Sequence, residues 1–232
     1  MRKLIDELDH LCSVKEFSNI GGALILRDEE RTFNYTVEVL RETSNEFLIK
    51  LPLVNLDAIK PKELLSELKL EFKRKRELSK LEEYNNFEEV IKFFSKDIAG
   101  TTSGDIKYLF LSMPHHPEKE FHDCADQLCT LRYNSFDLSL DFNQIDVALY
   151  ADAPINIFYC SLFAVLISST SGLNISNLSF SFHNCYILKE NLAKIARVIE
   201  SDDEISTVKV CINKPINDIM CIDEDSFEIE IL

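Results

Sequence analysis

The feature that most constrains the fold is a long, nearly continuous apolar segment in the second half of the chain. From Ile155 to Leu173 almost every residue is apolar or small, and this is about the length that a membrane-spanning helix needs. The segment also contains Asn156 and several serines, and it has no basic flank. Pro154 is a typical first residue of a helix, and Gly172 is a typical end. We therefore expect a helix buried on nearly all sides within a globular domain rather than a membrane span.

Shorter patterns on either side predict the elements that cover this helix. Alternating apolar residues over 127–150 predict a hairpin that turns at Asn134-Ser135. One face of that hairpin should carry Leu131, Tyr133, Phe136, Leu138, Leu140 and Phe142. Helices are expected at 1–17, 61–82, 87–96 and 189–201. Strands are expected at 23–26, 32–40, 47–51, 106–113, 178–182, 185–188, 208–212 and 227–231, with a hairpin connection at Asp28-Glu29-Glu30. The pattern predicts a single α+β domain over residues 1–232 with a mixed sheet.

The composition argues against two classes of partner and indicates a reducing compartment. The chain of 232 residues has a net charge of −15, which argues against nucleic acid and anionic membrane surfaces as partners. Its seven cysteines are an odd number without close pairing. Together with the lack of a signal peptide pattern, this favours reduced thiols in a cytoplasmic protein. Only five glycines are present, and no glycine-rich nucleotide motif is found.

Two stretches of the chain, Leu51-Pro52-Leu53-Val54 and residues 138–157, resemble motifs of the thymidylate synthase family. Leu51-Pro52-Leu53-Val54 resembles a Phe-Pro-Leu-Val segment that leads into a helix bearing a catalytic glutamate, and Glu67 matches that glutamate. Residues 138–157 align without a gap to the family's strand, its Gln-Arg-Ser phosphate motif and its Pro-Phe-Asn-Ile motif. In that alignment Gln144 matches the glutamine, and Asn156 matches the asparagine that reads the pyrimidine ring.

Two later stretches extend the resemblance in the same order. Residues 178–192 stand at the place of the Gly-Asp-x-His-x-Tyr strand and the helix that follows it, and residues 215–231 resemble the terminal Glu-Asp-Phe-x-Ile-Glu strand. The chain is also similar to the pyrimidine nucleotide hydroxymethylases. The resemblance implies a thymidylate-synthase-like fold, which is an α/β (α+β) domain with a mixed, kinked sheet and a long buried central helix. It also implies a homodimer that packs sheets back to back, and the apolar strands favour such cover on a second face.

The positions that bind substrate in the family differ here. The arginine that grips the nucleotide phosphate is replaced by Ile145 and the serine beside it by Asp146, which reverses the electrostatics of that subsite. His183 stands at the family's aspartate and Cys185 at its sugar-binding histidine. The folate-packing tryptophans have no counterpart, and the sequence stops at Leu232, where the family continues into a mobile closing tail.

The nucleophile has two candidate positions. In one alignment His115, within Met113-Pro114-His115-His116, takes the place of the family's cysteine. In the other, Cys124 occupies that place with nearly the family's spacing to Asn156. The same region gathers His115, His116, His122, Cys124 and Cys129. Their spacings match no compact zinc pattern, so we expect no metal.

Two classes of function remain at this point. The loss of phosphate, sugar, folate and lid residues favours a non-catalytic or repurposed interaction or regulatory protein without a cofactor. The alternative is a folate-dependent C5 methyl- or hydroxymethyltransferase that uses methylenetetrahydrofolate and acts on an unusual pyrimidine nucleotide or nucleoside. In that case Cys124 and Glu67 would be catalytic, and Gln144, Asn156, His183 and Cys185 would bind the substrate.

Overall fold

The computed structural model describes residues 2–13, 18–20, 23–52, 66, 106–111, 127–134, 136–200, 205–214, 216 and 224–232. Its first half contains α1 (Arg2–Ser13), β1 (Ser18–Ile20), β2 (Ala23–Thr36), β3 (Glu38–Arg41), β4 (Glu46–Pro52), β5 (Ile106–Leu111) and β6 (Gln127–Tyr133). Its second half contains β7 (Asp137–Ile145), α4 (Ala153–Ser171), β8 (Asn174–Leu188), η3 (Lys189–Asn191), α5 (Leu192–Glu200), β9 (Ile205–Ile212), η5 (Glu224–Ser226) and β10 (Phe227–Ile231). The helices expected at 61–82 and 87–96 lie outside the described residues, except for Ser66.

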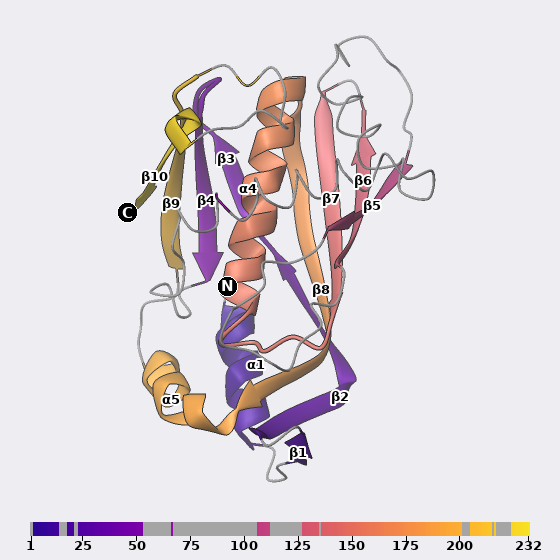
Figure 1. Cartoon of the computed structure of the whole chain (residues 1–232), viewed down its shortest axis with the longest axis vertical. Coiled ribbons are helices and arrows are strands. Elements are labelled where there is room, and N and C mark those ends of the chain that lie inside the picture. Colours follow the sequence, from indigo (N-terminus) through magenta and orange to yellow (C-terminus); the bar gives the residue numbers. More distant parts are fainter. Residues whose placement is uncertain are drawn as a thin grey trace.

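The helix α4 lies between two sheets (Figure 1). It contacts β7 and β8 of a six-stranded sheet with the order β1-β2-β8-β7-β6-β5, and β4 of a four-stranded sheet with the order β10-β9-β4-β3. Within the described strands β7 and β8 are the one parallel pair, so the larger sheet is mixed. The prediction of an α+β chain with a mixed sheet and a long buried helix is confirmed. The sequence did not indicate that the strands divide between two sheets.

The boundaries of α4 follow from its ends, and its burial follows from its two neighbours. Pro154 lies in the first turn, and Gly172 ends the helix at φ 75°, where its N–H donates to the carbonyl of Ser168 over 2.9 Å. The hydroxyl of Ser161 donates to the carbonyl of Ile157, so a polar group inside the core is satisfied. α4 is long and apolar enough to cross a membrane, but 89% of the span is buried inside the domain. It is therefore a core helix, as the sequence predicted.

The predicted hairpin of β6 and β7 is present, with one correction. Burial alternates along β7, and Leu138, Leu140 and Phe142 turn toward α4. Phe142 stacks on Phe180 of β8, with ring centroids 5.2 Å apart. Phe136 was expected on the same face, but 74% of it is exposed. It precedes the strand in a turn in which the side-chain oxygen of Asn134 accepts its N–H at 2.8 Å, so it is not held to the alternation of the sheet.

The hairpin expected at Asp28-Glu29-Glu30 is wrong, because β2 is one continuous strand. It pairs with β8 on both sides of this charged stretch, with a register shift between Asp28 and Thr32. Opposite the shift, Asn184 of β8 has a φ of 51°, and Asp146 at the end of β7 has a φ of 58°. These irregularities align across three neighbouring strands and give the kink that was expected. Figure 1 shows β2 and β8 bending together at the lower end of the sheet.

The four-stranded sheet is tied to the far end of α4 by Arg41. Its guanidinium lies 5.4 Å from the centroid of the Phe47 ring and donates to the carbonyl of Gly172 at 3.4 Å. It also donates to the carbonyls of Thr43 and Ser44 in the turn between β3 and β4. The inner face of this sheet buries Phe47, Ile49, Leu51, Val208 and Val210. One side chain thus satisfies carbonyls of both the helix end and the hairpin.

The single strand predicted at 32–40 is wrong, because β2 ends at Thr36 and β3 begins at Glu38 in the other sheet. A strand that continues through Val37 would have to pair in both sheets at once. Other predicted elements match the structure where it describes them. The strand predicted at 47–51 is β4, the strand at 106–113 is β5, and the two pieces at 178–188 are one strand, β8. The helix at 189–201 begins as η3 and continues as α5. α1 buries Leu8 and Leu11 and contacts α5 and β2.

Candidate functional site

Two of the predicted substrate-binding residues meet at the junction of β7 and α4. Gln144 is at the end of β7, on the face turned toward α4, and Asn156 is in the first turn of α4. The amide nitrogen Nδ2 of Asn156 donates to Oε1 of Gln144 over 2.9 Å. Only 6% of Gln144 and 5% of Asn156 is exposed. A buried polar side chain costs free energy unless it is bonded, so this pair satisfies part of each amide inside the core.

Each of the two side chains has one further hydrogen-bonding group that this bond does not use. Each amide carries one acceptor and one donor group, and the bond uses Oε1 of Gln144 and Nδ2 of Asn156. The donor Nε2 of Gln144 and the acceptor Oδ1 of Asn156 make no hydrogen bond to another residue in the described part of the chain. A neutral donor next to a neutral acceptor can bind a flat polar edge such as that of an amide or a pyrimidine ring. Asn156 does not serve as the helix N-cap, since that position is Asp152.

The connection from β7 to α4 is anchored on β8 by backbone bonds. The N–H of Asp146 donates to the carbonyl of His183 at 2.9 Å, and the N–H of Leu149 donates to the carbonyl of Tyr186 at 3.0 Å. The N–H of Tyr186 donates in return to the carbonyl of Val147. This anchoring fixes the entry into α4, and with it the position of Asn156 relative to Gln144.

The other two predicted substrate-binding residues lie elsewhere around this junction. His183 pairs in register with Ile145, whereas Gln144 pairs with Phe182. Neighbouring residues of a strand point to opposite faces, so His183 lies on the face away from the amide pair. There its Nδ1 is 3.0 Å from Oγ1 of Thr32 on β2. Cys185 lies beyond the kink and is 2% exposed. Of the four predicted residues, Gln144 and Asn156 are joined by a hydrogen bond, and His183 is placed on the other face of the sheet.

The electrostatics of the junction are neutral to acidic. Ile145 is 52% exposed at the position that matches the phosphate-binding arginine, and Asp146 beside it is also exposed. Residues 133–188 contain four aspartates and no lysine or arginine. The segment that builds the junction therefore supplies no fixed cation to hold a phosphate dianion.

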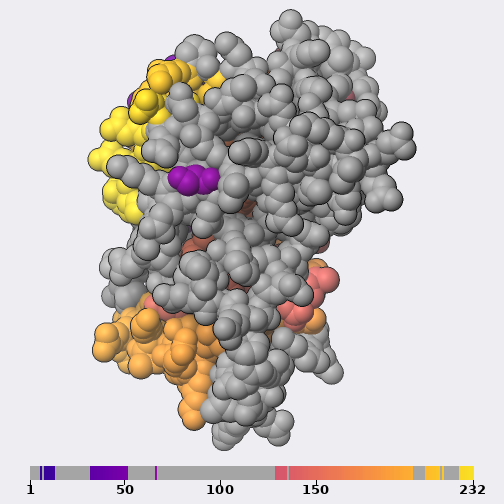
Figure 2. Space-filling view, in the orientation of Figure 1, coloured from indigo at the N-terminus to yellow at the C-terminus, as the bar shows by residue number. Residues whose placement is uncertain are grey.

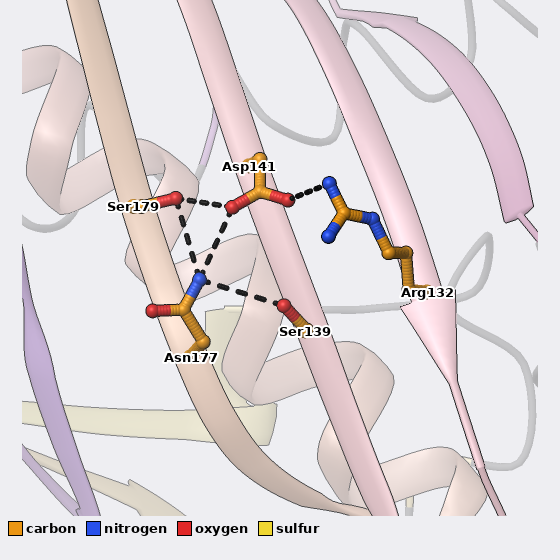
Figure 3. A network of polar contacts seen from close by, with 5 residues as sticks. All are labelled: Arg132, Ser139, Asp141, Asn177 and Ser179. Carbon is orange, nitrogen blue, oxygen red and sulfur yellow. Dashed lines mark hydrogen bonds and ion pairs between the residues drawn. The ribbon is translucent and has the colours of Figure 1, made fainter.

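A second polar cluster lies on the face of the six-stranded sheet that points away from α4 (Figure 3). Asp141 of β7 is its centre. Its Oδ1 accepts bonds from the hydroxyl of Ser179 and, at 3.1 Å, from Nδ2 of Asn177. Nδ2 of Asn177 also lies 3.4 Å from Oγ of Ser139. Oδ2 of Asp141 is enclosed and lies 2.9 Å from Nη2 of Arg132, as an ion pair without a well-aligned hydrogen bond.

This cluster and the contact of Thr32 with His183 were not predicted from the sequence. The signal for the cluster was present: polar residues recur at every second position over 139–143 and 177–181, which is typical of a sheet face outside the core. The apolar strands had instead favoured an apolar second face in need of cover. The described strands show hydroxyl, amide and charged groups there instead.

The described cysteines do not form a reactive or metal-binding centre. Cys12, Cys129, Cys160, Cys185 and Cys211 are all free thiols. Burial, and then the charge of Asp141, raises the pKa of the Cys129 thiol well above its usual range, which favours the unreactive neutral form. Among the described residues no group of three or more His, Cys, Asp or Glu side chains could hold a metal ion.

The predicted catalytic residues Glu67 and Cys124 lie outside the described residues. The alternative nucleophile position His115 and the neighbouring histidines His116 and His122 do as well. The choice between His115 and Cys124 therefore stays a prediction, and so does the expectation that no metal binds there. No known protein family and no curated protein matches this chain.

Proposed function

We propose that this chain is a divergent relative of the thymidylate synthases that no longer methylates dUMP and serves as a non-catalytic interaction or regulatory protein. One observation carries the proposal. The buried amide pair of Gln144 and Asn156 lies where β7 ends. The next residue, Ile145, is exposed on the opposite face with His183, Asp146 is acidic, and residues 133–188 contain no lysine or arginine. In this proposal the neutral part of a pyrimidine pocket is kept as architecture, and the described residues that build the junction offer the phosphate no cationic partner.

Isothermal titration calorimetry with dUMP, dCMP, the free nucleosides and a reduced folate tests the proposal. We expect no binding heat with any of them. Tight binding of any pyrimidine by the wild type, lost in Asn156→Ala, would contradict it. The matched control is Asn143→Ala, which removes an amide from the neighbouring position of β7, where the side chain points away from the pair.

A second function, catalysis on an unusual pyrimidine, is favoured by the remaining hydrogen-bonding capacity of the same pair. Nε2 of Gln144 and Oδ1 of Asn156 could read the edge of a pyrimidine base without help from a phosphate grip. The enzyme would then transfer a methyl or hydroxymethyl group from methylenetetrahydrofolate to C5 of a nucleoside or unusual nucleotide. Cys124 would be the nucleophile and Glu67 the proton relay. Binding of a nucleoside together with release of the C5 hydrogen as solvent-exchanged tritium would establish this function, and Cys124→Ser should abolish the release.

We also propose that the protein is a homodimer. The face of the six-stranded sheet that points away from α4 suits a polar interface, because Asp141, Arg132, Asn177 and Ser179 present donors and acceptors there. A dimer of this kind would depend on hydrogen bonds more than on apolar burial. Sedimentation velocity over a range of concentrations tests it, and a monomer at every concentration would contradict it.

A further inference from the structure

The strand β10 closes one side of the four-stranded sheet. In the described part of the chain it pairs with β9 alone, so its other side is the edge of the sheet. It forms the left margin of the molecule in Figure 1, and the yellow atoms of this segment lie at the surface of the left margin in Figure 2. An edge strand carries a row of backbone donors and acceptors that another chain can extend.

The register identifies which backbone groups face outward. The N–H of Leu232 donates to Thr207 at 2.8 Å, and the N–H of Asn213 donates to Ser226 at 3.0 Å. In an antiparallel pair, bonded positions alternate with unbonded ones. The even-numbered residues of β10 therefore bond to β9. The N–H and C=O groups of Phe227, Ile229 and Ile231 point to the open edge.

The side chains add a charge pattern to this edge. Glu228 and Glu230 are exposed on the outer face of the sheet, and neither forms an ion pair with a described residue. Lys209, which stands opposite Glu230 in register, is 3.0 Å from Glu46 instead. On the other face, Phe227 at the start of β10 is buried, while 43% of Ile231 at its end is exposed. Residues 224–232 contain four acidic residues and no basic residue.

This pattern discriminates between possible occupants of the edge. A second copy of β10 would place glutamates beside glutamates, which is unfavourable for directly opposed like charges. A strand with lysine or arginine opposite Glu228 and Glu230 would form close cross-strand pairs. Those positions are the unbonded ones of the new ladder, where side chains approach most closely. Apolar residues between the basic ones would cover Ile229 and Ile231.

We propose that β10 is a docking edge for an extended segment of a partner protein in which basic residues alternate with apolar residues. The segment adds a fifth strand to the four-stranded sheet, antiparallel to β10. Its backbone bonds to Phe227, Ile229 and Ile231, and its basic side chains pair with Glu228 and Glu230. The inference deepens the proposed role as an interaction protein and rests on it, because it names the class of partner.

Fluorescence anisotropy with a labelled Ser-Val-Lys-Val-Lys-Val-Ser peptide and the full chain tests the proposal. We expect saturable binding, weakened about tenfold or more when the three valine amides are N-methylated, since methylation removes the edge bonds and leaves the charge. The double variant Glu228→Lys/Glu230→Lys should lose this peptide and bind a peptide with Glu in place of Lys. The matched control is Glu190→Lys/Glu200→Lys, which changes the net charge equally at exposed positions away from β10 and should bind normally.

Two results would overturn the docking edge. The N-methylated peptide could bind as well as the parent peptide, or the control variant could lose as much affinity as the β10 variant. Either result would mean that the peptide binds through nonspecific attraction to an acidic protein and not through the edge of β10. Rescue by the charge-swapped peptide shows that the β10 variant is folded, so loss without rescue also counts against the proposal. Pyrimidine titration on the same sample separates the two proposals. Nucleotide binding contradicts only the proposed function, and absence of peptide binding contradicts only this edge.

Discussion

The two sheets share one helix but differ on their outer faces. Both direct apolar side chains toward α4, with Leu140 and Phe142 from one and Phe47 and Val210 from the other. The outer face of the six-stranded sheet joins hydroxyl and amide groups around one carboxylate, which also pairs with Arg132. The outer face of the four-stranded sheet carries separate ion pairs, Lys50 with Glu38 at 2.8 Å and Lys209 with Glu46 at 3.0 Å.

The difference shows which conditions each sheet should respond to. A half-buried hydrogen-bond network depends on geometry and on the exclusion of water, so it should be insensitive to salt and sensitive to the loss of one member. Exposed ion pairs are screened and contribute little individually. The inner faces therefore hold the fold together, while the outer faces differ in what they can offer to a partner.

The largest loss of stability is expected for a substitution in α4, because both sheets pack on this helix. Phe158 of α4 is fully buried, and Phe158→Ala should lower the free energy of unfolding by about 3–5 kcal/mol, through lost burial and the cavity left behind. Urea denaturation followed by circular dichroism measures it. Ser169→Ala, at the partly buried end of the same helix, should change stability by less than about 0.5 kcal/mol. A Phe158→Ala effect below about 1 kcal/mol would mean that α4 is not the shared core.

The second largest loss of stability is expected when the amide pair of Gln144 and Asn156 is broken. Asn156→Ala leaves Oε1 of the buried Gln144 without its donor, and we expect a loss of about 1–3 kcal/mol in the free energy of unfolding. Asn143→Ala removes an amide of the same type from the opposite face of β7 and should cost far less. Equal losses in the two variants would show that the contact of Gln144 with Asn156 has no special role.

Tyr35, on the inner face of the six-stranded sheet, should make the free energy of unfolding fall at alkaline pH. Burial raises the pKa of Tyr35 from 10.0 to about 12. The unfolded chain therefore releases this proton first, and the stabilisation is full below pH 10 and lost as the pH rises toward 12. We expect the wild type to lose roughly 2 kcal/mol more than Tyr35→Phe over this range. Parallel pH profiles for the two proteins would contradict the assignment.

Substitutions on the outer faces should cause the smallest losses of stability, and the two sheets should differ most clearly in how these losses depend on salt. Asp141→Asn removes the charge that pairs with Arg132 and weakens the bond from Ser179. We expect the free energy of unfolding to fall by about 1–2 kcal/mol. Most of this loss should persist at 1 M salt, because only the pair with the exposed Arg132 is screened.

In the four-stranded sheet, the hydrogen bond and the charge of Lys209 lower the pKa of Glu46. The contribution of Glu46 is thus present above its ordinary pKa and lost as the pH falls. At low salt, the free energy of unfolding should fall slightly less toward acid pH in Glu46→Gln than in the wild type. At high salt, the two proteins should show the same pH dependence. Salt-sensitive loss in Asp141→Asn and salt-insensitive loss in Glu46→Gln would reverse the comparison.

The sequence predicted the parts of the fold that depend on local pattern. α4 follows from its apolar length, from Pro154 and from Gly172, and the turn at Asn134 follows from the chemistry of its side chain. β2 was split in two because Asp28-Glu29-Glu30 looks like a turn, while its continuity depends on pairing with β8 about 150 residues away. Local residues cannot reveal a partner at that distance.

The same limit applies to the candidate site. Order along the chain brought Gln144 and Asn156 together correctly, because twelve residues and one helix turn separate them. It also grouped His183 with them, although the regular alternation of Phe180, Phe182 and His183 along β8 places this side chain on the other face, beside Thr32. Which face of β8 meets α4 and the amide pair depends on the pairing of β8 with β7, and a single sequence does not contain that pairing.

The junction of β7 and α4 pairs two neutral amides, and residues 133–188, which build it, include no lysine or arginine. We infer that this segment gives the phosphate of a nucleotide no partner. Calorimetric titration of the wild-type chain with dUMP and deoxyuridine under identical conditions tests it most directly. We expect that the phosphate adds no affinity and that neither dUMP nor deoxyuridine gives binding heat. Binding of dUMP at least tenfold tighter than deoxyuridine would contradict it, because a cation would then have to reach the phosphate beside Ile145.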